Sequence, residues 1–302
     1  MDDIATSRIA PLPRGARVMS YWLTQTLNGL SFGMLLFFLA SGLTLTLGVM
    51  RVTNLTHGSF YLVGAYIALD VMQSFNSFFA AAVLAAVIIA VMGAIVFGLL
   101  QVVGTDHLRE TLLTFGLVFI VADLALMHWG GDPTAVAKPR FLSGPFDFGG
   151  YSYPTYRLFI IALGASVAIA MELIQRKTLI GATVRAVVDD VEMAGGIGLN
   201  SKLIGLATFL VGAALAGLSG ALGGAMIGAH PGADIEVLLY ALVVVIIGGM
   251  GSLTGSLVGA LLVGLIDAFG RALVPELGAS LMFLLMVGTL IVRPTGLFGT
   301  KS

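Results

Sequence analysis

The stretch QRKTLIGATVRAVVDDVEMAGGIGLNSK, residues Gln175 to Lys202, is a polar island between two long apolar runs. Its apolar residues recur at the i, i+3, i+4, i+7 spacing of one helical face: Val184, Val187, Val188, Val191 and Ala194. Its charged residues lie on or beside the opposite face: Arg185, Asp189, Asp190 and Glu192. Gly195 and Gly196 then end the helix, because glycine adopts the left-handed C′ conformation without a Cβ penalty. The stretch predicts a short amphipathic helix over Gly181–Gly195, either resting on lipid headgroups or docked into a soluble partner that drives a membrane part.

The composition around this stretch is that of an integral membrane protein. Of 302 residues, 58% are hydrophobic and 10% are charged, whereas soluble domains carry about a quarter charged residues. The 40 glycines suit helices whose backbones approach closely in lipid. No basic tract indicates nucleic-acid binding. The absence of cysteine excludes disulfides, thiolate metal sites and cysteine catalysis.

Nine apolar segments divide the chain, and a hydrocarbon core requires about 20 residues for a crossing. They are roughly Leu27–Met50, a second run ending at Met72, Phe78–Val103, Leu112–Met127, Leu158–Ile174, Leu203–Gly228, Val237–Gly249, Leu253–Val274 and Leu277–Val292. We expect an uncleaved polar tail over residues 1–20, one transmembrane domain over 21–299, and a short tail over 300–302. Within the domain, 130–156 is the largest extracytoplasmic loop and 175–202 is the cytoplasmic coupling loop.

The stretch RVTNLTHG separates the first two apolar runs. It contains the polar residues Arg51, Asn54 and His57, followed by Gly58. If all nine segments cross the membrane with the N-terminus outside, eight Lys and Arg residues lie on the cytoplasmic side and seven on the outer side. This near-equal division does not indicate an orientation of the chain. If the chain instead turns back within the membrane here, ten basic residues lie inside and four outside, and the N-terminus is cytoplasmic. The second count favours an all-α bundle of eight crossings plus one broken or re-entrant segment, with non-helical backbone covered by protein or a cavity.

Small residues form two ladders in the second half of the chain. The ladders repeat every four residues and include Gly212, Gly220 and Gly224, then Gly251, Gly255 and Gly259. Such a stripe lets a neighbouring helix approach closely, so we interpret both ladders as helix packing rather than pore lining.

Motifs for enzymatic chemistry are missing from the sequence. It has no GxxxxGK[ST] phosphate loop, so the chain does not hydrolyse nucleotide itself, and no HExxH pair for a metal. No cofactor is expected. The composition also suits a secondary transporter or channel, which would show inverted repeats and need no nucleotide-binding partner.

Four stretches resemble the permeases of branched-chain amino-acid ABC importers. They are GLTLTLGVMRVTNLTHGSFYLVGAY (42–66), RAVVDDVEMAGGIGLN (185–200), VIIGGMGSLTGSLVGALLVGLID (245–267) and IVRPTGLFG (291–299). The similarity runs from Asn28 to Gly299 and is greatest to the first of the two related permeases. It implies a bacterial inner-membrane subunit that pairs with a second homologous permease, two cytoplasmic ATPases and a periplasmic binding protein.

The resemblance also implies functional residues. The sequence G-x-x-x-R-A from Gly181 to Ala186, with Asp189 and Ala194 downstream, is similar to the family's ATPase-contacting loop. The polar groups inside or beside apolar runs are candidates for the translocation path or a helix break: Asn54, His57, Gly58, Asp123 and Asp267. For Asn54 and His57 we favour a hydrogen bond that pins a helix break. For Asp123 we expect the permease interface or the bundle interior, and for Asp267 a packing or interface role.

Three positions depart from the family pattern near the presumed path. Ser59 replaces the usual glutamate, Ala122-Asp123 replaces a Gln-Asn pair, and Asp267 replaces a glutamate. Relatives also import urea, short-chain amides and aromatic or dicarboxylic compounds, so these remain alternatives to a branched-chain amino acid.

Overall fold

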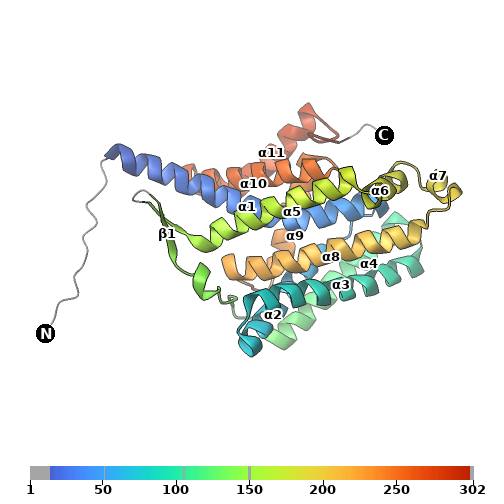
Figure 1. The fold of residues 1–302 in the computed structure, drawn as a ribbon, viewed down its shortest axis with the longest axis horizontal. Coiled ribbons are helices and arrows are strands. Elements are labelled where there is room, and N and C mark those ends of the chain that lie inside the picture. The colour runs from blue at the N-terminus through green and yellow to red at the C-terminus, as the bar shows by residue number, and fades with distance from the viewer. Residues whose placement is uncertain (1–13, 51, 105, 149–150, 300–302) are drawn as a thin grey trace.

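The computed structural model describes residues 14–50, 52–104, 106–148 and 151–299 (Figure 1). Residues 1–13 of the predicted 1–20 tail, the predicted tail 300–302 and Arg51 of the predicted break lie outside the described residues, whereas residues 14–20 form the start of the first helix. Within those ranges the α-helices are α1 (Arg14–Met50), α2 (Thr56–Phe75), α3 (Phe78–Val103), α4 (His107–Trp129), α5 (Thr155–Lys177), α6 (Leu179–Asp189), α7 (Val191–Gly196), α8 (Ser201–Met226), α9 (Ala233–Gly248), α10 (Leu253–Leu273) and α11 (Gly278–Val292). Two 3₁₀ turns, η1 (Arg140–Leu142) and η2 (Pro275–Leu277), and two strands, β1 (Pro145–Phe148) and β2 (Tyr151–Pro154), complete the described elements.

The prediction of a polytopic helical bundle is confirmed. Six of the described helices, α1, α3, α4, α5, α8 and α10, are long and apolar enough to cross a membrane. Most of them lie roughly along the long axis in Figure 1, with the short α6 and α7 together at one end. The small exception to an all-helical fold is the antiparallel β1–β2 hairpin, which lies in the predicted 130–156 loop and pairs Pro145 with Pro154.

The centre of the bundle is formed by α1 and α8. Phe37 and Phe38 of α1 and Phe209 of α8 are fully buried, and Phe209 meets Phe60 of α2 and Phe97 of α3 edge to face. Aromatic pairs of this kind add to the stability that buried apolar area supplies. Side chains of α2, α3, α9 and α10 complete this core.

Close backbone contacts explain the glycine ladders. Gly212 lies against the carbonyl oxygen of Gly42, and Gly220 against that of Tyr61, so a Cβ at either position would collide with backbone. Gly255 and Gly259 are crowded in the same way by the backbone of α9, whereas Gly224 is crowded by the side chains of Val136 and Ala65. Gly251 differs from the prediction. It lies in the turn before α10 with φ at +78°, so it serves a left-handed turn and not a helical stripe.

The start of α1 and the α6–α7 loop lie at opposite ends of the bundle, whereas the prediction placed the N-terminal tail and the coupling loop on the same side. The first half of α1 lies with the start of α5 and the end of α10, where Trp22 stacks on Phe269. The last turn of α1 lies at the other end, where Gly48 meets Gly251 and Val188 (Figure 1). After α1 the chain reverses direction, and residues 52–55 and α2 together carry it from the α6 end to the opposite end, where Asp70 accepts a hydrogen bond from Trp129, so the segment does not return to the α6 end as a re-entrant loop would. It is therefore one passage that is partly non-helical, and the arginines near the start of α1 lie opposite α6.

Candidate functional site

The α5–α6 junction is a tight turn capped by one threonine. Thr178 Oγ1 accepts a hydrogen bond from the Gly181 amide at 3.2 Å and so caps α6. Gly181 lies directly against the backbone of Gln175, where any side chain would collide. This contact gives Gly181 a structural role in folding α6 back against the end of α5.

The single helix predicted over Gly181–Gly195 is wrong, because the structure has two helices. α6 ends at Asp189, and Asp190 takes extended backbone angles between α6 and α7. Asp190 Oδ1 accepts a hydrogen bond from the Met193 amide at 2.9 Å. An aspartate side chain competes with the helix for backbone donors, and at this position it starts a new helix instead of continuing the first.

The predicted apolar face is turned inward rather than toward a partner. Val187 is 1% exposed and Ala194 is 2% exposed, and both pack on Val49 at the end of α1. Val184 and Val188 flank this cluster, whereas Val191 is exposed. The end of α1 offers apolar surface within the same chain, where α6 buries Val187 and α7 buries Ala194.

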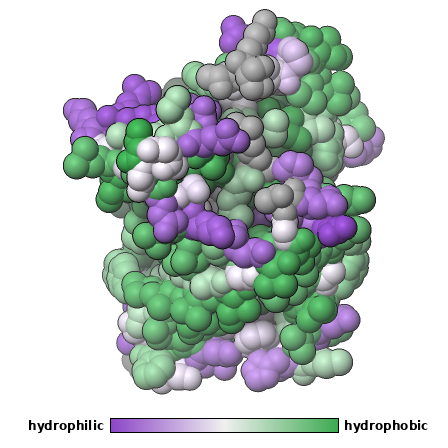
Figure 2. Space-filling model, turned by 90° about the vertical axis from the view of Figure 1, so that its right-hand side faces the viewer, coloured by the Kyte–Doolittle hydropathy of each residue, from purple (hydrophilic) through white to green (hydrophobic). Residues whose placement is uncertain are grey.

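The outward surface of α6–α7 is mixed in character. Arg185, Asp189, Asp190 and Glu192 are all exposed, as predicted for the polar face. Met193 and Ile197 are exposed beside them, which the helical spacing did not predict. Figure 2 looks onto this end of the molecule and shows hydrophilic side chains gathered across its upper and middle parts beside hydrophobic surface.

The break before α2 is a hydrogen-bonded cap inside the protein. Asn54 is 1% exposed, and its Oδ1 accepts from the Thr56 amide at 3.1 Å. Asn54 Nδ2 lies 3.1 Å from Nδ1 of the fully buried His57. Gly58 faces the carbonyl oxygen of Asp234 at the start of α9, so this glycine allows α2 and α9 to cross closely. These contacts are of the kind expected for hydrogen bonds that pin a helix break, and a role of Asn54 and His57 in the translocation path stays a prediction.

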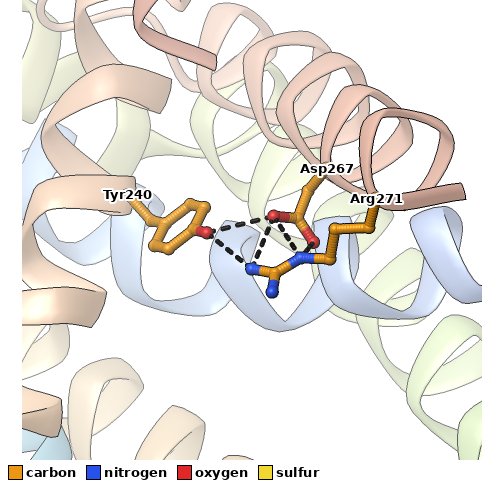
Figure 3. Close-up of polar contacts among 3 residues, drawn as sticks. All are labelled: Tyr240, Asp267 and Arg271. Carbon is orange, nitrogen blue, oxygen red and sulfur yellow. Dashed lines mark hydrogen bonds and ion pairs between the residues drawn. The ribbon is translucent and has the colours of Figure 1, made fainter. Parts of the chain in front are cut away.

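The opposite end of the bundle holds a polar cavity of about 550 Å³ between α1, α9 and α10. Tyr240 of α9 and Asp267 of α10 are buried in its wall, and their side chains point toward one another (Figure 3). The Tyr240 hydroxyl donates to Asp267 Oδ1 at 3.0 Å. Arg271 Nε donates to both Asp267 oxygens at 3.0 and 2.9 Å, and its Nη2 donates to the Tyr240 hydroxyl at 3.1 Å.

The rest of the cavity wall carries charges of both signs. Glu236 and Arg157 line it, with Gln25, Asn28 and His230 between them. Asn28 is held in place because its Oδ1 accepts hydrogen bonds from Arg157 and from the Tyr153 hydroxyl of the hairpin. A wall with both carboxylates and guanidinium groups can meet both charges of a zwitterion.

The cavity residues were mostly missed by the sequence prediction. Only Asp267 was predicted as a site residue, and Arg157 and Arg271 are two of the four basic residues that the charge count placed outside. One signal was present, because Asp267 and Arg271 stand at the i, i+4 spacing of a helical ion pair. Tyr240 and Glu236 join them through the packing of α9 on α10, which no local pattern indicates.

Asp123 does not lie in the bundle interior. It is exposed on α4, where Phe119, Leu124 and Met127 are exposed as well. Within the described residues, no hydrogen bond or ion pair reaches its carboxylate. The interior placement is excluded, and the interface with a second permease stays a prediction.

These features define an integral membrane protein of the transport-permease class. The chain belongs to the family of branched-chain amino acid transport system permease components, whose model matches residues 25–290.

Curated relatives of this family align with nearly the whole chain. The high-affinity branched-chain amino acid transport system permease protein BraD of Pseudomonas aeruginosa is 28% identical over 299 residues, covering 92% of this chain and 96% of the relative. LivH of Escherichia coli K12 is 26% identical over 300 residues with the same coverage. The probable permease LivH of Methanocaldococcus jannaschii is 25% identical over 284 residues, covering 88% of this chain and 89% of the relative. A solved structure of PsaBC from Streptococcus pneumoniae in complex with Fab aligns with a TM-score of 0.49 and 11% identity, covering 88% of this chain and 89% of that one.

Proposed function

We propose that this chain is the permease subunit of an ATP-binding-cassette importer in the bacterial inner membrane. It forms half of the translocation path with a second homologous permease, and two cytoplasmic ATPases drive it. A periplasmic binding protein delivers the solute, which is a branched-chain or related amino acid. The chain itself is non-catalytic in this proposal, in keeping with the absence of a phosphate-loop motif from its sequence.

One observation carries the proposal: the polar cavity and the α6–α7 pair lie at opposite ends of an apolar bundle. We assign the α6–α7 end to the cytoplasm, where its exposed charges meet an ATPase. The cavity and the N-terminal end of α1 then lie on the outer side, toward the binding protein. This orientation replaces the cytoplasmic N-terminus expected from the loop charges.

The chemistry of the cavity supports an amino acid as solute. A zwitterion presents one carboxylate and one ammonium group, and the wall offers Arg157 and Arg271 for the first and Glu236 for the second. Asp267 is already engaged by Tyr240 and Arg271, so its role is to hold that guanidinium in position. The neighbouring apolar positions Phe32 and Val237 suit an aliphatic side chain.

Uptake into proteoliposomes tests the assignment. The chain is reconstituted with its second permease, its ATPases and its binding protein, and labelled leucine is supplied outside. We expect uptake that requires ATP and the binding protein. Uptake that runs on an ion gradient without the ATPases would show a secondary transporter. ATP-dependent uptake of urea, an amide or a dicarboxylate in place of leucine would replace the substrate class.

The orientation has a separate test, because the natural chain has no cysteine. Two exposed positions suit single cysteines: Glu192 on α7, and Ser143 between η1 and β1. A membrane-impermeant thiol reagent added to whole cells, with the outer membrane permeabilised, should label Ser143→Cys and leave Glu192→Cys unlabelled. The reverse pattern would invert the proposed orientation.

A further inference from the structure

One face of the membrane-length helix α4 is exposed along the helix. Residues at the i, i+4, i+7, i+11 and i+15 positions form this outward face, and all are exposed: Leu112, Gly116, Phe119, Asp123 and Met127. The opposite face holds the buried residues Thr114, Val118 and Ala125, where α4 packs on the bundle. Because α4 is long and apolar enough to cross a membrane, its outward face meets either lipid or another membrane polypeptide.

Asp123 lies at hydrocarbon depth on this face. It comes six residues before Trp129, the last residue of α4, which is about 9 Å along the helix axis. Long side chains such as lysine can reach the headgroups over such a distance, whereas the short aspartate cannot. No described residue donates a hydrogen bond to its carboxylate or pairs with it. A carboxylate that faces acyl chains is unfavourable, so a polar group from outside this chain must meet it.

The outward face of the other long helix beside α2, α3, has no such group. Its exposed stretch between Val83 and Leu99 contains no polar residue, as expected for a surface that meets lipid. Both helices carry an exposed glycine whose Cβ would have no atom within 4 Å, Gly98 on α3 and Gly116 on α4. The carboxylate is therefore what distinguishes α4. A polar group near a small residue is the combination found where helices associate in bilayers.

We propose that the outward face of α4 is the surface on which the second permease docks. A transmembrane helix of that partner donates a hydrogen bond to Asp123 and approaches closely at Gly116. The inference rests on the proposed function, because it names the surface that meets a partner which that function requires. The partner differs in sequence from this chain. A two-fold pair would bring the same face of both copies together at the same depth, where two Asp123 carboxylates would repel each other.

Photocross-linking in the assembled transporter tests this surface. Phe119 on the outward face of α4 and Val91 on the exposed face of α3 are replaced, one at a time, by p-benzoylphenylalanine. We expect the Phe119 variant to cross-link to the second permease and the Val91 variant to cross-link to lipid alone. Cross-linking of the Phe119 variant to lipid alone would refute the surface, and cross-linking to a second copy of this chain would refute the choice of partner.

This readout is separate from uptake. If leucine uptake succeeds while Phe119 contacts only lipid, the proposed function stands and the docking surface is wrong. If Phe119 cross-links to the second permease while uptake fails, the docking surface stands and the proposed function is wrong.

Substitution of Asp123 separates assembly from folding. Asp123→Leu removes a charge from an exposed position, so the thermal stability of the isolated chain in detergent should not fall. The amount of second permease that co-purifies with the tagged chain should fall roughly three- to thirtyfold, the range that one interhelical hydrogen bond supplies in a membrane. Asp123→Asn keeps an accepting oxygen and should lose less. Co-purification at the natural level with Asp123→Leu would show that the carboxylate does not hold the partner.

The two open glycines provide a matched pair of variants. Gly116→Leu fills the place of close approach on α4 and should lower co-purification of the second permease. Gly98→Leu makes the same change at an equally open position of α3 and should have no effect. Equal co-purification with the two variants would refute docking on α4.

Discussion

The two ends of the bundle use polar side chains in opposite ways. At the cavity end, Tyr240, Asp267 and Arg271 form a closed network in which each group contacts both others. At the α6–α7 end, the charged side chains are exposed, and Val187 and Ala194 pack inward on Val49. Buried polar groups need fixed partners, so the cavity end is preorganised. Exposed charges keep their freedom, which suits orientation of a separate protein.

This difference predicts that substitutions at the α6–α7 end affect either folding stability or ATP-coupled uptake, whereas substitutions at the cavity end affect folding stability and solute binding together. At the α6–α7 end, inward residues should control folding while outward residues control contact with an ATPase. At the cavity end, the same network shapes the wall and holds Arg271 in place, so one substitution should affect both.

The largest effect is expected for Val187→Asp. Val187 is almost fully buried against Val49, and a carboxylate there has no described partner, at a cost on the order of 3–5 kcal/mol. We expect α6 to detach, and reconstituted uptake to fall to background. Thermal unfolding in detergent and uptake are the two measurements.

The matched control is Val191→Asp, which places the same charge on an exposed position of α7. It should leave thermal unfolding unchanged and lower only ATP-coupled uptake. If Val187→Asp is as stable and active as the natural protein, burial of Val187 is needed neither to hold α6 in place nor for uptake.

A smaller effect is expected for Asp267→Ala. Loss of the carboxylate removes hydrogen bonds from Tyr240 and Arg271, each of which contributes about 1–3 kcal/mol when a charge is involved. The low end applies, because the Arg271 side chain is 57% exposed. Stability and the apparent affinity for solute should fall together. Asp267→Asn retains one acceptor, so its stability and its apparent affinity for solute should lie between those of Asp267→Ala and the natural protein. If Asp267→Ala lowers stability alone, the cavity is not part of the translocation path.

A loss of about 1 kcal/mol in local stability is expected for Asp190→Ala, because the cap of α7 is removed. Hydrogen exchange at the Met193 amide should accelerate several-fold while exchange in α8 stays constant. Asp190→Asn keeps the accepting oxygen and should preserve protection. If both variants protect Met193 equally, the break between α6 and α7 does not depend on this cap.

The smallest effect is expected for Tyr240→Phe, which removes one hydroxyl from the cavity network. Its loss should cost about 0.5–1.5 kcal/mol and leave Arg271 bound to Asp267 alone. We expect a modest fall in the affinity for solute with little change in maximal uptake. Tyr21→Phe is the control, because Tyr21 lines the same cavity and its hydroxyl makes no hydrogen bond to the described residues. Equal effects of the two changes would show that the network has no special role.

The sequence predicted most of the helices because hydrocarbon-length apolar runs leave few structural options. The predicted run Phe78–Val103 coincides with α3, and Leu253–Val274 differs from α10 by one residue. The predictions were weaker where side chains compete with backbone. Asp190 could continue a helix or cap the next one, and helical periodicity alone does not decide between them.

The sequence by itself determined that this chain is a helical integral membrane protein, because composition and apolar length depend only on residue type, and its resemblance to the permeases was carried by four local stretches. It also indicated the break at Asn54 and the close packing at Gly212, since polar groups and missing side chains act locally. The tertiary structure decided which end of α1 lies beside α6, which face of α6 is buried, and which charges meet around the cavity. These depend on contacts between residues far apart in the chain, such as Val49 with Val187 and Tyr240 with Asp267, and no local spacing encodes them.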